Sequence, residues 1–271
     1  MPAVMKGLLI RFVLAGLLAA APLAGQAADG NSLKPGPEAI VGAVVGGDTV
    51  VLERPVMGAT QIRLVGIQAP KLPLGRKNFP VWPLAAQSKR ALEKLTLSKT
   101  VSLSFGGSEK DRHGRLLAHL HAPGGVWVQG EMLSQGMAQV YSFPDNRGAV
   151  ADMLALERGA RRAKRGIWGL GFYAVRTPGE LGPLIGTFQL VTGRVLKADK
   201  VKSKIYLNFG QDWRSDFTIT LKTGTRRLFA KAGVDPLALK GRMVRVRGWL
   251  KKFNGPMIDA THPEQIEVIS P

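Results

Sequence analysis

Hydrophobic and polar residues change their spacing several times in the first part of the chain, and each change predicts an element. Runs in which apolar and β-branched residues alternate with polar ones are typical of strands. Such runs cover residues 49–52, 61–67, 101–105, 116–122, 126–128 and 137–143. Apolar residues at helical spacing, with charged residues between them, cover residues 85–97, 128–135 and 149–163. This part of the chain is therefore predicted to be α+β, mainly β with a few helices.

The pattern after residue 186 is different, because strand-like runs dominate it. They cover residues 188–197, 204–209, 217–222, 243–250 and 265–269. A helix fits between the third and fourth runs, in residues 226–239, and Gly-Val-Asp-Pro at 233–236 breaks it. Five short strands with a helix in this place suggest a second, small OB-fold-like β-barrel over residues 186–271. Residues 170–185, which contain Gly, Pro and mixed residues, are predicted to be the linker between the two domains.

The N-terminal residues have the pattern of a secretory signal peptide over residues 1–27. Lys6 and Arg11 precede or interrupt an apolar run at residues 12–23, and small residues follow it. The pattern predicts cleavage between Ala27 and Ala28, and therefore an exported protein that is periplasmic or secreted. An uncleaved membrane anchor is the alternative, although the apolar run is short for a bilayer span. Residues 28–38, rich in Gly, Asn, Pro and charge, are predicted to be a short leader.

The charge balance narrows the possible partners. The 271 residues include 38 Lys and Arg but only 19 Asp and Glu, which gives a net charge of +19. Such a surplus favours polyanions, with nucleic acid as the first candidate and envelope polymers or membrane surfaces as alternatives. The sequence contains no cysteine, so an exported chain of this kind must be held together by core packing instead of disulfides.

Three charged motifs occur in a characteristic order. Asp48 follows two glycines at the start of a predicted strand, Arg63 lies in the next strand, and residues 111–115 read Asp-Arg-His-Gly-Arg. Together with residues 133–138 and the closing Gly-Ile-Trp-Gly at 166–169, their order and spacing resemble the staphylococcal nuclease-like (thermonuclease) family. The resemblance covers about residues 39–169 and implies an OB barrel with helices in this region.

The resemblance also implies a set of site residues. The family holds Ca²⁺ with two aspartates and a main-chain carbonyl, binds phosphate with two arginines, and positions or activates water with a glutamate. The positions that match the first aspartate and the two arginines are Asp48, Arg63 and Arg115. The second aspartate is replaced by Gln68, the carbonyl belongs to Ala69, and the glutamate is replaced by Lys71.

These replacements affect hydrolysis more than binding. Ca²⁺ prefers several anionic oxygens, whereas Gln68 offers a neutral one, so Asp48 with Gln68 makes a weak metal site. Lys71 adds positive charge, which suits a phosphate better than a metal or a general base. We expect an exported nucleic-acid-binding protein with a degenerate site and weak or absent phosphodiesterase activity. The alternatives are an active metal-dependent nuclease and a non-enzymatic envelope protein that binds another polyanion or a protein.

Further substrate-binding candidates come from aromatic and basic residues. Tyr141 and Phe143 match family positions near the bound nucleotide. In the predicted second barrel, strict alternation places Arg245 and Arg247 on one strand face, opposite two valines. Basic and stacking aromatic groups could together bind a single strand there, although aromatic residues also fill barrels. The substrate-binding candidates are therefore Lys71, Tyr141, Phe143, Tyr206, Trp213, Arg245 and Arg247.

Overall fold

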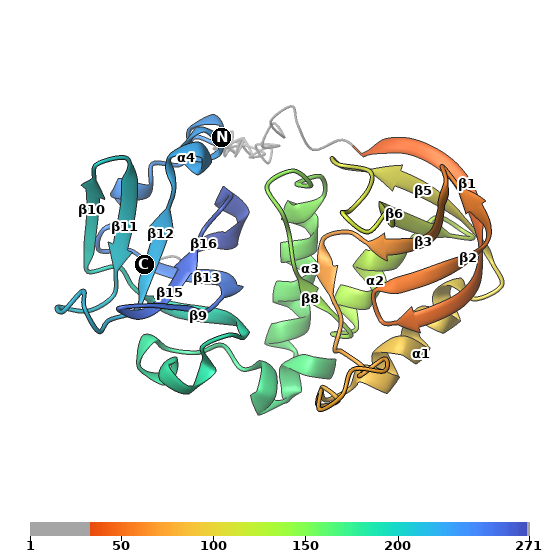
Figure 1. Cartoon of the computed structure of the whole chain (residues 1–271), viewed down its shortest axis with the longest axis horizontal. Coiled ribbons are helices and arrows are strands. Elements are labelled where there is room, and N and C mark those ends of the chain that lie inside the picture. The colour runs from red at the N-terminus through yellow and green to blue at the C-terminus, as the bar shows by residue number, and fades with distance from the viewer. Residues whose placement is uncertain (1–32, 270–271) are drawn as a thin grey trace, which may run out of the picture.

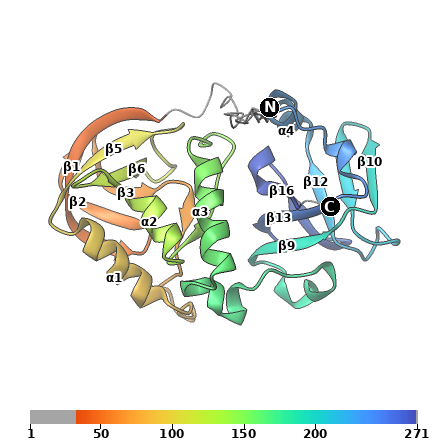
Figure 2. The same cartoon turned by 180° about the vertical axis from the view of Figure 1, so that it is seen from behind.

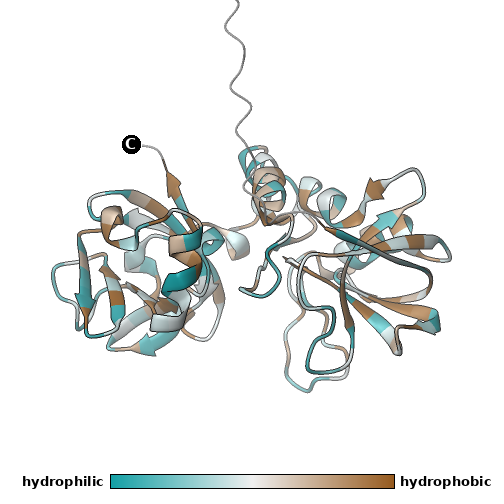
Figure 3. Cartoon of the chain, turned by 90° about the horizontal axis from the view of Figure 1, so that it is seen from above, coloured by the Kyte–Doolittle hydropathy of each residue, from teal (hydrophilic) through white to brown (hydrophobic). Residues whose placement is uncertain are grey.

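The computed structural model describes residues 33–269, so the predicted signal peptide and its cleavage site lie outside the described residues. Two β-rich domains lie on either side of helix α3 (Val150–Arg162) (Figure 1), and the view from behind shows the same arrangement (Figure 2). From above they are separate lobes, each with hydrophobic segments in its strands (Figure 3). Each lobe has its own buried core. The α+β, mainly β class predicted from the sequence is confirmed. Within the described residues, no helix has the length and apolar character needed to cross a membrane.

The first domain is a closed barrel. Its sheet runs in the order β3-β2-β1-β5-β6-β7, and β3 also pairs in parallel with β6, which closes the ring. All other neighbours in this sheet are antiparallel. The strands are β1 (Lys34–Gly46), β2 (Thr49–Val56), β3 (Ala59–Leu64), β5 (Thr100–Phe105), β6 (Leu116–Ala122) and β7 (Val126–Trp127).

Helices cover the barrel as the apolar spacing predicted. Each helix contributes an apolar side chain to the barrel core: Leu92 from α1 (Ala85–Thr96), Met132 from α2 (Val128–Ser134) and Met153 from α3. A short antiparallel pair, β4 (Ile67–Gln68) with β8 (Gln139–Val140), connects the barrel to α3. The strand predicted at 137–143 is thus much shorter than expected. The leader predicted at 28–38 is wrong from Lys34 onward, because pairing with β5 makes a strand of a Pro- and Gly-rich sequence.

The second domain contains two sheets around one core. One sheet has the order β10-β11-β12-β15-β14 and the other β16-β13-β9. As in the first domain, one pair is parallel, β12 with β15. The OB-fold assignment for residues 186–271 stays a prediction. The strands are β9 (Phe188–Arg194), β10 (Lys197–Val201), β11 (Lys204–Asn208), β12 (Thr218–Leu221), β13 (Met243–Trp249), β14 (Lys251–Phe253), β15 (Gly255–Asp259) and β16 (Ile266–Ile269).

The helical region of this domain divides at the predicted break into α4 (Thr223–Lys231) and the 3₁₀ helix η5 (Pro236–Leu239), and Gly233 takes a positive φ of 68° between them. The hairpin of β14 and β15 was missed, since its sequence lacks clear alternation. Asn254 makes this turn with a φ of 59°, a conformation that Asn tolerates better than most residues.

The connection at residues 170–185, which was predicted to be the linker, is a packed segment. It folds into the 3₁₀ helices η2 (Gly171–Tyr173), η3 (Pro178–Glu180) and η4 (Gly182–Leu184). The Tyr173 hydroxyl donates a hydrogen bond to the Pro83 carbonyl at 3.0 Å, and Leu181 is buried in the core of the second domain. Thr177 and Glu180 form a capping box at the start of η3.

A buried ion network joins the two domains. Arg247 from β13 is only 1% exposed, and its guanidinium donates to Glu157 of α3 at 2.9 and 3.0 Å and to Glu267 of β16 at 2.8 Å. Glu157 also accepts from Arg161 at 2.8 Å and from the Val140 backbone N–H at 2.6 Å. The prediction that Arg247 lies on an open basic face is therefore wrong. Strand alternation places its side chain opposite the valines, but α3 covers that face.

Two more polar contacts connect the domains at the end of β8. Ser142 Oγ and His262 Nε2 share a hydrogen bond of 2.7 Å, and both residues are buried. Burial lowers the pKa of His262 to about 4, so its imidazole is neutral at neutral pH. Arg147 and Glu264 form an ion pair at 2.6 Å nearby. The domain arrangement thus rests on specific polar contacts as well as on the packed connection.

We expect Arg247→Ala to destabilise the full chain by about 3–5 kcal/mol, because it leaves buried carboxylates without their main cation. Urea unfolding measures this change. Arg158→Ala is the matched control, since Arg158 pairs with the same Glu267 at 3.1 Å but has a side chain that is 42% exposed. The control should lose no more than about 1 kcal/mol. Equal small losses for both variants would show that the buried network does not hold the domains together.

Candidate functional site

Asp48 lies in the tight turn between β1 and β2 and is buried. Its Oδ2 accepts hydrogen bonds from the Ala69 backbone N–H at 2.8 Å and from Lys71 Nζ at 2.6 Å. Gly47 allows this close packing, because a Cβ at that position would clash with Ser88 Oγ and the Ala69 side chain. The glycine in the sequence motif is therefore required by the lack of space for a Cβ.

Arg63 is fixed beside Asp48 by main-chain carbonyls. Its Nη1 donates to the carbonyls of Asp48 at 3.0 Å and Leu64 at 2.9 Å, and its Nη2 donates to the Ile67 carbonyl at 2.7 Å. Nη2 also lies 3.3 Å from Asp48 Oδ2. Arg63 is thus held rigidly at the barrel surface and part of its hydrogen-bonding capacity is already used.

The Asp-Arg-His-Gly-Arg motif forms a turn that positions Arg115. Oδ1 of Asp111 accepts the backbone N–H groups of His113 at 2.9 Å and Arg115 at 3.0 Å, while Gly114 has a φ of 77°. The other oxygen of Asp111 accepts from Arg115 Nε at 2.8 Å and pairs with its Nη2 at 2.6 Å. Burial tends to raise the pKa of Asp111, but these hydrogen bonds hold it below its usual value. Sequence reasoning missed this positioning role of Asp111.

A surface pocket of about 610 Å³ brings four of the predicted residues together. Arg63 and Arg115 lie in its lining with the aromatic side chains of Tyr141 and Phe143. The cations in its lining outnumber the carboxylates of Asp111 and Asp145: the cationic residues are Arg63, Lys110, Arg112 and Arg115. Guanidinium groups that converge on one pocket suit a phosphate, which accepts several charge-assisted hydrogen bonds.

The charge of Asp48 is neutralised inside the protein. Burial alone would raise the pKa of this carboxyl group, but the Arg63 and Lys71 cations hold the pKa below its ordinary value of 3.8. Burial also lowers the pKa of Lys71, while Asp48 acts in the opposite direction. The short contact between the Asp48 carboxylate and the Lys71 ammonium group is therefore an ion pair, in which Lys71 compensates the negative charge of Asp48.

The residues present do not fit the Ca²⁺ site that the family resemblance implies. The oxygen of the Gln68 side chain accepts a hydrogen bond from Gln139 at 3.0 Å, and the residue is buried. Lys71 and the Ala69 N–H already bind Asp48 Oδ2. Between residues 33 and 269 there is no group of three or more His, Cys, Asp or Glu side chains able to hold a metal. A hard cation would meet one paired carboxylate and an ammonium group.

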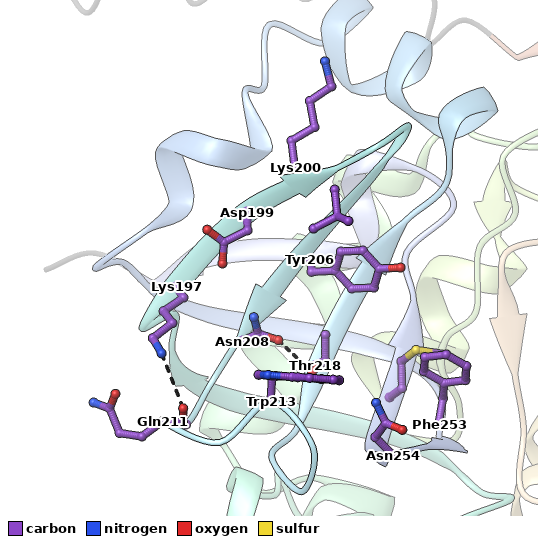
Figure 4. Close-up of a pocket in the computed structure, with 13 residues that line it drawn as sticks. Lys197, Asp199, Lys200, Tyr206, Asn208, Gln211, Trp213, Thr218, Phe253 and Asn254 are labelled. Atoms are coloured by element: carbon purple, nitrogen blue, oxygen red, sulfur yellow. Dashed lines mark hydrogen bonds between the residues drawn. The ribbon is translucent and has the colours of Figure 1, made fainter.

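The candidates of the second domain do not form a single face. Tyr206 and Trp213 line a pocket of about 660 Å³ together with Phe253 (Figure 4). Arg245 lies on the other sheet and donates to Thr192 Oγ1 at 3.1 Å, and Arg247 is buried at the domain junction. The expected combination of stacking aromatics with these two arginines is therefore wrong, because Tyr206 on β11 and Trp213 in the loop after it lie apart from the sheet that holds Arg245 and Arg247.

The structure adds two aromatic residues that the sequence did not indicate. Trp249 Nε1 donates to the Tyr141 hydroxyl at 3.0 Å, and the ring centroid of Phe188 lies 5.2 Å from that of Tyr141. Phe143 packs edge-on against Tyr141, with centroids 4.8 Å apart. The second domain thus packs against the aromatic edge of the pocket that holds Arg63 and Arg115. No local signal could reveal these contacts, since Tyr141 and Trp249 are 108 residues apart.

Comparisons with known proteins identify relatives of the first domain. The family model of staphylococcal nuclease homologues matches residues 61–169. The chain is 33% identical over 137 residues to Endonuclease YhcR of Bacillus subtilis (strain 168), which aligns 48% of this chain with 11% of that protein. It is 34% identical over 126 residues to an uncharacterized endonuclease of Escherichia coli O157:H7, and 26% identical over 131 residues to a Thermonuclease of Staphylococcus hyicus. Each of these two alignments covers 46% of this chain and 72% of the relative.

We expect Asp48 to stabilise the fold in a pH-dependent way. Its pKa is lower in the folded chain than in the unfolded chain, so its stabilising contribution is complete above pH 3.8 and is lost as the pH falls through the folded-state pKa. Asp48→Asn should lower the melting temperature near pH 7 by leaving two cations unpaired, and this difference should shrink as the pH falls to about 3. Thermal unfolding at several pH values measures it. A difference that stays constant with pH would contradict the assignment.

Proposed function

This chain belongs to the family of staphylococcal nuclease homologues, and from this premise we propose that it binds nucleic acid through a phosphate held by Arg63 and Arg115. The observation that carries the proposal is the pocket in which both arginines meet Tyr141 and Phe143. The net charge of +19 supports it, because a basic protein gains affinity for nucleic acid by releasing counterions. The aromatic side chains give such a site faces on which a base can stack.

We propose in addition that phosphodiester hydrolysis is weak or absent. Hydrolysis needs a group that takes a proton from water and positive charge placed at the developing anion. Lys71 occupies the position where the resemblance implies a glutamate, and as an ammonium ion it has no lone pair with which to accept a proton. Its contact with Asp48 at 2.6 Å also uses the carboxylate that a metal would need. These residues support phosphate binding better than water activation.

An active nuclease is the second candidate function. It is favoured by the relatives whose names include endonuclease or thermonuclease. The two candidates differ in one measurable property, cleavage, while both need the phosphate pocket.

We also propose that the protein is exported, on the basis of the charged, apolar and small residues that follow one another over residues 1–27. An anionic envelope polymer is the alternative ligand in that compartment.

In a cleavage assay with labelled DNA and RNA, we expect activity near background in the presence of Ca²⁺. A Gln68→Asp, Lys71→Glu double variant should cleave more than the natural chain, since it removes the ammonium from Asp48 and adds carboxylates. A known thermonuclease serves as the positive control. Robust Ca²⁺-dependent cleavage by the natural chain that disappears in Asp48→Ala would instead support the active nuclease.

Oligonucleotide binding at several salt concentrations tests the phosphate pocket. We expect Arg115→Gln to weaken binding and to reduce the slope of log affinity against log salt by about 0.7–0.9, the effect of one lost phosphate contact. Arg90→Gln is the control, because Arg90 is exposed on α1 and does not line the pocket. It removes the same charge and should change affinity little. Equal effects of the two substitutions would leave only diffuse attraction between charges.

A further inference from the structure

A second pocket lies at the domain junction, directly beside the phosphate pocket. It has a volume of about 310 Å³ and is lined by Tyr141 and Phe143 from the first domain and by Phe188 and Trp249 from the second. Tyr141 and Phe143 also line the phosphate pocket. The two pockets therefore share an aromatic wall.

The shared wall is both ordered and accessible. The Tyr141 hydroxyl accepts a hydrogen bond from Trp249 Nε1 at 3.0 Å, and Phe188 packs edge-on against both rings, with centroids 5.2 Å from Tyr141 and 6.2 Å from Trp249. Nevertheless Phe143 is 44% exposed and Trp249 is 41% exposed. Large aromatic rings that are held in place but open to solvent have faces available for stacking.

Positive charge continues into the junction pocket. Lys222 and Lys251 lie in its lining, where both contact Asp259, at 3.5 and 2.8 Å. Their side chains are more than half exposed, and two cations face one carboxylate. Arg247 also lies in the lining, but its charge is satisfied by the buried glutamates. An aromatic wall with accessible ammonium groups fits a base attached to a phosphate, which is the chemistry of a nucleotide.

We propose that the junction pocket is a nucleotide-binding subsite that the second domain adds to the phosphate pocket. The inference rests on the proposed function. When Arg63 and Arg115 hold a phosphate, the base of a neighbouring nucleotide stacks against Trp249 and Phe143, with its phosphate toward Lys251. The ligand is single-stranded, because in a duplex the base faces are covered by their neighbours. The second domain is therefore part of the binding site and not only an attached module.

The test measures binding of fluorescent oligothymidylates to the full chain, from the dinucleotide to the octanucleotide. Trp249→Ala should weaken octanucleotide binding by about five- to a hundredfold, with the salt dependence unchanged, because stacking involves no net charge. Trp249→Phe should keep most of the affinity, since it retains a stacking ring but loses the hydrogen bond to Tyr141. Phe172→Ala is the control, an exposed aromatic residue packed against Trp82 and outside the junction pocket. Thermal melting verifies that each variant is folded.

The outcomes separate the subsite from the proposed function. If Arg115→Gln weakens binding but Trp249→Ala does not, the subsite is wrong and the phosphate pocket stands. If Arg115→Gln has no effect, the proposed function itself fails. If Trp249→Phe loses as much affinity as Trp249→Ala, Trp249 acts only by holding Tyr141, and the stacking role is overturned. The same loss on duplex DNA as on the single strand would also overturn it.

Discussion

The buried charge of Arg247 is the constraint on which the arrangement of this molecule depends. A guanidinium group that is removed from water must keep its carboxylate partners, and these come from α3 and β16. Glu267 lies in the second domain with Arg247, so the second domain can take only positions that keep Glu157 of α3 close to Arg247. Burial tends to lower the pKa of Arg247, but the two glutamates outweigh this effect and raise it, so the charge is retained.

This network also controls the aromatic edge of the candidate site. The backbone of Val140 belongs to the network. Its carbonyl accepts a hydrogen bond from Arg247 at 3.3 Å, and its N–H donates one to Glu157 at 2.6 Å. Tyr141 directly follows Val140 in the first domain. Trp249 lies two residues after Arg247 in the second domain. The hydrogen bond between Tyr141 and Trp249 is thus supported by a fully buried ion pair. The ion pair that joins the domains therefore also supports the shape of this aromatic surface.

The distribution of charge in the candidate site favours phosphate binding over metal binding. Asp48 is buried, and it is stabilised by Arg63, Lys71 and the Ala69 N–H. These partners compensate its negative charge, so the carboxylate attracts a divalent cation only weakly. Arg115 is held by Asp111 at the pocket surface and remains directed at solvent. The site therefore presents net positive charge, which favours an anion as ligand.

The sequence by itself determined the α-helices of the first domain, most strands and four residues of the phosphate pocket, because periodicity and motif spacing are local properties. The replacements at Gln68 and Lys71 were also visible there. The tertiary structure decided which cationic side chains are accessible to a ligand. Arg115 and Arg247 both follow predicted turn or strand patterns, yet one lines a pocket and the other is buried against Glu157, 90 residues away. Alternation assigns a side chain to a face of a strand, but it cannot show what packs on that face. For the same reason β1, the packed connection and Trp249 became evident only in the folded chain, where distant segments supply their partners.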